Sequence, residues 1–349
     1  MQRSRWLRPL AIVLVTVAIV VCAGALITPE LPAPTGDLAV GRDRFSWVDA
    51  VRPEISTPDQ TDKREYVLES WYPAARGSGT APSYVPDLGR VRGGLIQSGE
   101  FGWYEVLGMQ FVRSHARVGA DVLEGRPRHP VVVLSPGNAT NVEFYAGLAE
   151  DLASRGFVVL GINHPYDVAA VALSEGRVAV LPADEPAAMA ARVDRIAQRI
   201  DERTADVTSV VDRVRLADGV LGRLRERIDP ERIAVIGHSL GGITAAQACA
   251  ADLRLRSCAN LDGLQGGGPF SVRPGGQVPN QPFLLITKEP GAERFAGPTV
   301  ETKIIAGATH RDFTDGPVIE PTLTGRASSI EVMRQVREHL ANFLKRTLG

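Results

Sequence analysis

Apolar residues recur along this chain in two alternating patterns, short continuous runs and longer stretches with helical spacing. The runs VVVLS at 131–135 and FVVLGIN at 157–163 are continuous, which is typical of strands buried on both faces of a sheet. Residues 64–72 (REYVLESWY) alternate instead and predict a half-buried strand. Residues 142–153 carry apolar side chains at four-residue spacing, so they predict a helix between the two buried strands.

The same alternation of elements continues to the C-terminus. Residues 169–181 predict a hairpin, and residues 189–214 predict a long amphipathic helix on the sheet, with or without a break near Thr204. A short helix is expected to end at Asp229-Pro230. Further strands are predicted at 233–237, 257–261, 282–287 and 302–306, and a helix is predicted at 244–251. A C-terminal helix is also expected, with Ser328 and Glu331 as a capping box at its start.

Repeated strand–helix units with apolar strands predict the α/β class, a mainly parallel sheet with helices on both faces. The length of 349 residues allows one large domain, which we expect at 37–349. Ligands of such sheets bind beyond the carboxyl ends of the strands. We therefore expect the functional residues to follow the carboxyl ends of the strands.

The first 36 residues depart from this pattern. Three arginines precede an uncharged apolar stretch at 10–27, and Pro-rich sequence follows. This arrangement fits either a signal peptide or a membrane-anchor helix at 1–28, with a linker at 29–36. In both interpretations the arginines stay in the cytoplasm, so we expect the domain to be exported, either secreted or tethered to the membrane.

Charge and cysteine content narrow the function classes. The chain has 39 Lys and Arg residues against 40 Asp and Glu residues, a net charge of −1, and no basic stripe that would favour nucleic acid. Cys249 and Cys258 flank the loop that follows a predicted helix. A disulfide and two separate buried thiols both fit this pair.

One motif carries chemistry. Residues 233–242 read IAVIGHSLGG, in which a strand runs through Gly237-x-Ser239-x-Gly241 into a helix. That context predicts a nucleophile elbow, where the two glycines leave room for a tight turn. A phosphate-binding loop is excluded, because no Lys-Ser or Lys-Thr follows Gly242.

A serine nucleophile needs a base and a third group that orients the base. His310 follows a predicted strand directly, which places it at the carboxyl edge of the sheet and makes it the expected base. Asp262 and Glu289 each follow one of the strands after the elbow, and both give the chain order serine, acid, histidine. These considerations leave the choice of acid open.

The oxyanion of an acyl-transfer reaction is held by backbone N–H groups. One should belong to Leu240, the residue after the nucleophile, and one to the loop Ser135-Pro136-Gly137-Asn138. Because proline has no N–H, Asn138 is the predicted donor and Gly137 the alternative. His238, His164 and Gly137 are expected to line the pocket. Residues 95–112 are rich in aromatic side chains and form either a lid or acyl-pocket wall, or an ordinary helix on the sheet.

Several motifs in register resemble the α/β-hydrolases of the platelet-activating factor acetylhydrolase family, the plasma and isoform II group with its bacterial relatives. They run from PTGDLAVG at 34–41 through SWYPA, VVVLSPG, NHPYD, IDPERIAVIGHSLGG and NLDG to the loop of His310. The resemblance implies an α/β-hydrolase catalytic domain whose acid is Asp262 and not Glu289. It also implies hydrolysis of short or oxidised acyl esters of phospholipids without a metal ion or cofactor. Ser135-Pro136-Gly137 departs from the family's Ser-His-Gly.

The sequence therefore predicts a serine esterase with the triad Ser239, Asp262 and His310 and with oxyanion donors at Leu240 and Asn138. Its expected partners are a small-molecule ester or lipid and, through the N-terminal segment, a membrane. Three alternatives use the same fold: a carboxylesterase or cutinase-like polyester hydrolase, an acyltransferase, and a non-catalytic binding protein.

Overall fold

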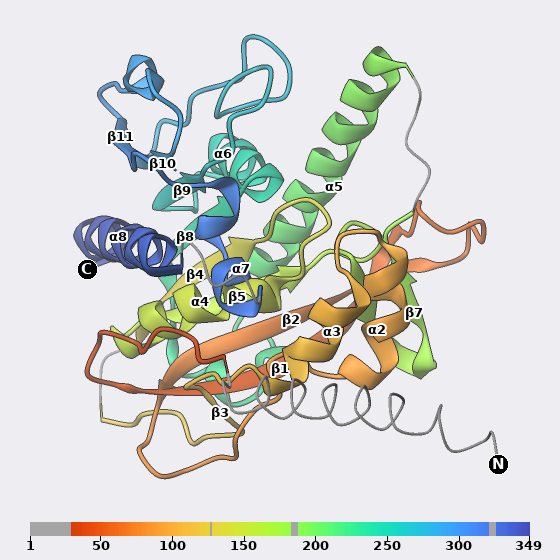
Figure 1. Ribbon diagram of the computed structural model, residues 1–349, viewed down its shortest axis with the longest axis vertical. Helices are drawn as coiled ribbons and strands as arrows, with labels where there is room; N and C mark the ends of the chain where they lie inside the picture. The colour runs from red at the N-terminus through yellow and green to blue at the C-terminus, as the bar shows by residue number, and fades with distance from the viewer. Residues whose placement is uncertain (1–28, 126–127, 183–187, 321–325) are drawn as a thin grey trace, which may run out of the picture.

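The computed structural model describes residues 29–125, 128–182, 188–320 and 326–349. Within these residues the core is a nine-stranded sheet with the order β11-β10-β9-β8-β4-β5-β2-β1-β3 (Figure 1). The strands from β11 to β5 run parallel, whereas β2 is antiparallel to both of its neighbours. A separate pair, β6 and β7, forms the predicted hairpin. The expected α/β class with a mainly parallel sheet is confirmed.

The strands of the main sheet have the following bounds: β1 (Ala39–Pro53), β2 (Lys63–Ala74), β3 (Arg117–Val118), β4 (His129–Ser135), β5 (Val158–Asn163), β8 (Ile228–His238), β9 (Ser257–Leu261), β10 (Phe283–Thr287) and β11 (Val300–Ile304). The hairpin strands are β6 (Ala170–Ala172) and β7 (Val178–Val180).

The described helices are α2 (Leu88–Gln97), α3 (Trp103–Gly108), α4 (Ala146–Ser154), α5 (Met189–Arg215), α6 (Leu240–Ala251), α7 (Gly316–Ile319) and α8 (Arg326–Leu348). Short 3-10 turns connect them: η1 (Met109–Phe111), η2 (Val142–Tyr145), η3 (Ser174–Gly176), η4 (Gly219–Leu224), η5 (Ala292–Phe295) and η6 (His310–Phe313).

Strand β4 shows why the apolar runs are continuous. Val132 and Leu134 belong to the core cluster that includes side chains of α4 and α8, whereas Val131 and Val133 belong to the cluster that includes α5 and α6. Successive side chains of a strand point to opposite faces, so both faces of this strand are covered. All four side chains are fully buried, and each contributes about 1.5–3 kcal/mol of hydrophobic stabilisation.

Strand β2 differs from its prediction, because it is buried on both faces and not on one. Its charged side chains form ion pairs inside the protein, which offset the cost of removing them from water. Arg64 pairs with Glu54 and Asp206, and Glu69 pairs with Arg42. The alternation in sequence therefore marks buried ion pairs, since a charged side chain remains inside only when a partner offsets its desolvation.

The structure also settles one question that the sequence left open, and some element boundaries differ from the sequence-based expectations. Helix α5 runs through Thr204 without a break, because no glycine or proline interrupts it. Strand β8 begins at Ile228, and Pro230 is tolerated where the pairing with β4 shifts register. Helix α8 already includes Arg326, so Ser328 lies inside the helix and is not its cap.

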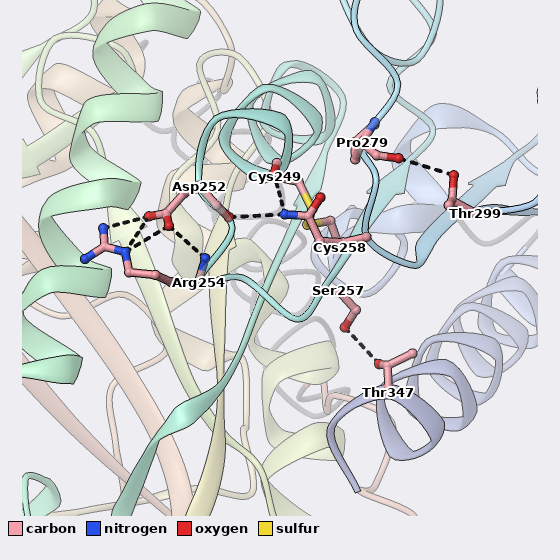
Figure 2. Close-up of a disulfide and its surroundings, with 9 residues drawn as sticks. Cys249, Asp252, Arg254, Ser257, Cys258, Pro279, Thr299 and Thr347 are labelled. Atoms are coloured by element: carbon pink, nitrogen blue, oxygen red, sulfur yellow. Dashed lines mark hydrogen bonds and ion pairs between the residues drawn. A yellow bond between two sulfur atoms is a disulfide. The ribbon is translucent and has the colours of Figure 1, made fainter.

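The disulfide left open by the sequence is present between Cys249 of α6 and Cys258 of β9 (Figure 2). Both cysteines are fully buried. The side-chain amide of Gln281 donates to the backbone carbonyls of Cys249 and Asp252 at 2.7 and 3.2 Å, which ties the end of α6 to the chain that enters β10. The bridge thus joins the helix that follows Ser239 to the strand that precedes Asp262.

The N-terminal expectations fall largely outside the described residues, which begin at 29. Among the residues that are described, no helix is both long and apolar enough to cross a bilayer. The segment expected as a linker packs on the domain: Leu31 is fully buried, and the backbone N–H of Thr35 donates to Asp151 at 2.9 Å.

Candidate active site

Ser239 stands at a sharp turn between β8 and α6. Its backbone has φ 54° and ψ −122°, a strained conformation for a residue with a side chain. Hydrogen bonds hold the turn, because the Ser239 N–H donates to the Leu261 carbonyl at 2.9 Å and the Gly242 N–H donates to the Ser239 carbonyl at 2.9 Å. This geometry matches the nucleophile elbow expected from the motif.

The two glycines of the motif are required by close backbone contacts. A Cβ on Gly237 would lie 2.1 Å from the carbonyl oxygen of Gly241, and a Cβ on Gly241 would lie 2.1 Å from that of Ser135. Neither contact can be relieved by moving a flexible side chain, since both involve backbone atoms. The glycines therefore let α6 begin directly against the ends of β8 and β4.

A short hydrogen bond joins His310 to Asp262. Nδ1 of His310 donates to Oδ2 of Asp262 over 2.6 Å, and Asp262 also accepts from the Thr287 hydroxyl at 2.7 Å and the Lys288 N–H at 3.1 Å. Burial alone would raise the pKa of Asp262, but these hydrogen bonds outweigh it and the pKa lies below its usual range. Asp262 is therefore an ionised carboxylate held behind the imidazole.

Glu289, the alternative acid, is directed elsewhere. Its carboxylate pairs with Lys288 and is about half exposed. The structure thus brings Asp262, and not Glu289, to His310.

The serine and the histidine line one cavity of about 200 Å³. No hydrogen bond joins the Ser239 hydroxyl to the His310 imidazole among the described residues, although both residues line this space. Such contacts are often long in substrate-free enzymes and tighten when substrate is bound. The cavity wall also includes Gly137, Asn138 and His238.

Two backbone N–H groups are candidates for binding an oxyanion, one on Leu240 next to Ser239 and one on Asn138 of the cavity wall. The N–H of Leu240 is at the first position of α6, where a helix leaves its donors unpaired. The N–H of Asn138 likewise has no acceptor among the described residues. The N–H of Gly137, the other candidate, donates to the Tyr145 hydroxyl at 2.9 Å and is therefore engaged.

His238 lines the cavity and takes part in a buried hydrogen-bond chain. The Tyr145 hydroxyl accepts from Gly137 and in turn contacts Nδ1 of His238 at 2.8 Å. The phenol has one proton that it can donate, and in the Nε2–H tautomer of the neutral imidazole Nδ1 of His238 accepts it. Burial, and then the nearby His310 ring, lower the pKa of His238 to about 3, so this imidazole is neutral.

His164 does not line the cavity, contrary to expectation. It is fully buried, with Nε2 at 3.1 Å from the Ser135 hydroxyl and Nδ1 at 2.8 Å from Asp206 of α5. Burial lowers its pKa to about 4. Ser135, His164 and Asp206 are joined by hydrogen bonds in the same way as the serine, histidine and acid of a catalytic triad. None of the three is exposed, so they join β4 to α5 and cannot contact a substrate.

Some residues at the site carry no recognisable sequence signal. Tyr145 lies in a predicted helix like any core aromatic residue, and Thr287 is the last residue of β10.

Residues 95–112 contain α3 and η1 and form part of the cavity wall, to which Phe101 and Glu105 contribute. In the part of the chain that the structure describes, no group of three or more His, Cys, Asp or Glu side chains is arranged to hold a metal ion.

Comparisons with known proteins identify the family that this chain resembles. The model of the family described as platelet-activating factor acetylhydrolase, isoform II, matches residues 29–345. A probable 1-alkyl-2-acetylglycerophosphocholine esterase of Arthroderma benhamiae is 24% identical over 269 residues, 73% of this chain and 64% of that protein. A platelet-activating factor acetylhydrolase of Cavia porcellus is 26% identical over 265 residues, 64% of this chain and 58% of that protein.

The chain spans about half to two thirds of the length of the curated relatives it matches. Among solved structures, a ferulic acid esterase from Streptomyces cinnamoneus has a TM-score of 0.73 and 27% sequence identity, covering 92% of this chain and 93% of that chain. The α/β-hydrolase fold expected from the motifs is consistent with this similarity to an esterase.

The buried neutral imidazole of His238 predicts a loss of stability in acid. An unfolded histidine has a pKa of about 6.5, whereas the pKa of His238 in the folded protein is about 3. Between these two pH values the histidine is protonated in the unfolded chain and neutral in the folded protein. Stability therefore falls as the pH drops through this window. His238→Asn keeps an acceptor for Tyr145, and we expect it to lose about 2 kcal/mol less than the parent between about pH 8 and pH 5. Urea unfolding at both pH values measures this difference, and equal losses in the two proteins would contradict the assignment.

Proposed function

Because the chain belongs to the platelet-activating factor acetylhydrolase, isoform II, family, we propose that it is a serine esterase that hydrolyses short-chain acyl esters, including those of phospholipids. The observation that carries the proposal is the 2.6 Å bond between His310 and Asp262 at the rim of the cavity that Ser239 also lines. A nucleophile, a candidate base and an orienting carboxylate thus come from three separate loops to one edge of the sheet.

The proposed reaction proceeds through an acyl-enzyme. His310 takes the proton of the Ser239 hydroxyl as the oxygen attacks the ester carbonyl, and it then gives that proton to the leaving alcohol. Water, activated by the same imidazole, attacks the acyl-serine and releases the carboxylic acid. The N–H groups of Leu240 and Asn138 bind the negative oxygen in both tetrahedral intermediates.

Asp262 supports the proposed base in two ways. Its hydrogen bond to Nδ1 leaves Nε2 of His310 as the nitrogen that accepts the serine proton. Its negative charge stabilises the imidazolium that forms, and the Thr287 hydroxyl and the Lys288 N–H keep the carboxylate in place.

The cavity wall favours a short acyl chain. Phe101 stacks on Phe144 with ring centroids 4.8 Å apart, and both side chains line the cavity with Ile319. A volume of about 200 Å³ leaves little room for a long chain to enter from the serine side.

A lipid-like ester is favoured by the outer surface of the same segment. Trp103, Tyr104 and Leu107 of α3 are 68%, 53% and 55% exposed, although Glu105 of this helix lines the cavity. Large apolar side chains grouped on a surface commonly mark a site for an apolar partner. The curated relatives named above are esterases of a phospholipid, which agrees with this substrate class.

Export of the domain is part of the proposal. The buried Cys249–Cys258 disulfide is typical of an oxidising compartment, and the sequence of residues 1–28 suits a signal peptide or an anchor. A carboxylesterase acting on other esters is the second candidate, favoured by the similarity to a ferulic acid esterase.

Replacing the nucleophile tests the esterase directly. We expect Ser239→Ala to lower kcat/KM for p-nitrophenyl acetate by at least about 10⁴-fold, because the variant lacks the hydroxyl that forms the acyl-enzyme in the proposed reaction. A labelled fluorophosphonate should modify the parent once per chain and leave the variant unlabelled, which controls for a contaminating esterase. Activity that survives in the variant would refute the catalytic assignment.

A pair of carboxylate variants distinguishes the two candidate acids. Asp262→Asn should lower kcat by about 10³-fold or more, because the amide cannot hold the required tautomer or stabilise the imidazolium. Glu289→Gln, which removes an exposed charge, should change kcat by less than about threefold. Steady-state kinetics with p-nitrophenyl acetate measures both values, and the reverse order would show that Glu289 is the acid.

A series of p-nitrophenyl esters from acetate to decanoate tests the acyl preference. We expect kcat/KM to be highest for the short esters and to fall at least about tenfold towards decanoate, because Phe101 and Phe144 close the cavity. Phe101→Ala should move the optimum to longer chains, since it opens that wall. A parent enzyme that prefers decanoate would contradict the short-chain proposal.

A further inference from the structure

Arg203 of α5 lies behind the loop that follows β4. Its side chain is fully buried, at 0% exposure, and does not line the cavity. Nη1 donates to the carbonyl of Pro136 at 2.5 Å and Nη2 donates to that of Gly137 at 3.2 Å, while Nε pairs with the carboxylate of Asp167. One guanidinium therefore holds two successive peptide groups of the loop.

The geometry of a trans peptide gives this contact a consequence for the site. The C=O and N–H of a trans peptide point in opposite directions within one plane, and no cis peptide occurs among the described residues. Because Arg203 holds the Gly137 carbonyl on the side of α5, the Asn138 N–H of the same peptide points away from α5. Gly137 and Asn138 are both at the cavity that Ser239 lines.

The preceding peptide shows the same arrangement with both ends occupied. Arg203 binds the Pro136 carbonyl, and the Gly137 N–H of that peptide donates to the Tyr145 hydroxyl. In the next peptide only the carbonyl is bound, since the Asn138 N–H has no acceptor among the described residues. That N–H is therefore held in place and remains available for a substrate oxygen.

We propose that Arg203 is a positioning residue of the oxyanion hole, which fixes the Gly137–Asn138 peptide so that the Asn138 N–H faces the developing oxyanion. This inference rests on the proposed esterase function. A charged donor on the carbonyl also polarises the peptide, which makes its N–H a stronger donor. Lysine cannot replace this fork, because it offers its donors from a single nitrogen.

Arg199 constrains the same residue from one helical turn earlier. It lies four positions before Arg203, on the same face of α5. Its guanidinium donates to the side-chain oxygen of Asn138 at 2.5 Å and to the carbonyl of Asp167 at 3.3 Å. Arg199 binds the side chain of Asn138, whereas Arg203 binds the carbonyl of the Gly137–Asn138 peptide. The orientation of that peptide group therefore depends on Arg203.

The test compares Arg203→Met and Arg203→Lys with the parent and with Arg42→Met. Arg42 is a matched control, because it is also buried and bound to a carboxylate and to two carbonyls, those of Ser83 and Tyr84, but these carbonyls belong to residues that do not line the cavity. The readouts are kcat and KM for p-nitrophenyl acetate and the inhibition constant of trifluoroacetone, which adds to the serine as a tetrahedral oxyanion. Circular dichroism and thermal unfolding identify the variants that are folded.

We expect Arg203→Met to lower kcat on the order of 100-fold with little change in KM, because the hole acts in the transition state. The inhibition constant of trifluoroacetone should rise by about the factor by which kcat/KM falls. Arg203→Lys should show the same two changes, about tenfold each. Arg42→Met should unfold at a lower temperature and keep both values within about threefold of the parent.

A folded Arg203→Met with kcat and inhibition constant within about threefold of the parent would overturn the inference. If that variant does not fold, Arg203→Lys is judged by the same criterion. Equal losses in Arg42→Met would also overturn it, because they would show a general effect of losing a buried arginine. A parent protein without esterase activity would overturn the proposed function and this inference together, whereas the other outcomes leave the proposed function intact.

Discussion

The site depends on one close approach of backbone to backbone. Helix α6 begins so near to the ends of β8 and β4 that a Cβ on Gly241 would lie 2.1 Å from the Ser135 carbonyl oxygen. That contact places the free N–H groups at the start of α6 next to the loop of Gly137 and Asn138. It also forces Ser239 into a strained turn, whose cost is offset by the hydrogen bonds and packing around it.

Behind this contact, α5 supplies the polar side chains that hold the neighbouring loops. Arg203 faces the loop after β4, and Asp206, three residues later, binds both Arg64 and His164. Burial would raise the pKa of Asp206, but Arg64 and His164 lower it well below its usual range. A buried charge without a partner is strongly destabilising, so these ion pairs favour the one placement of α5 on the sheet in which each charge is paired.

The carboxyl edge of the sheet thus combines a rigid and a variable part. The elbow, the loop after β4 and the Asp262–His310 pair are held by backbone contacts and buried hydrogen bonds. The wall formed by α3 and its neighbours packs Val106 and Met109 into the core but leaves Trp103 exposed. In the proposed function the ester chemistry uses the first part, and the substrate class depends on the second.

The sequence by itself determined strands β4, β5 and β8 to β11, helices α4, α5, α6 and α8, and the elbow, because these features are encoded by local periodicity and by two glycines that a tight turn requires. Strand β1 and helix α2 were not predicted. Periodicity and chain order left open whether Asp262 or Glu289 pairs with His310, since both residues follow parallel strands, and the family resemblance favoured Asp262. The tertiary structure shows which carboxylate contacts the imidazole, that of Asp262. It also moved His164 from the pocket into the core and brought Arg203 to the loop after β4. Contacts between residues far apart in the chain leave no local pattern, and these polar partners are contacts of that kind.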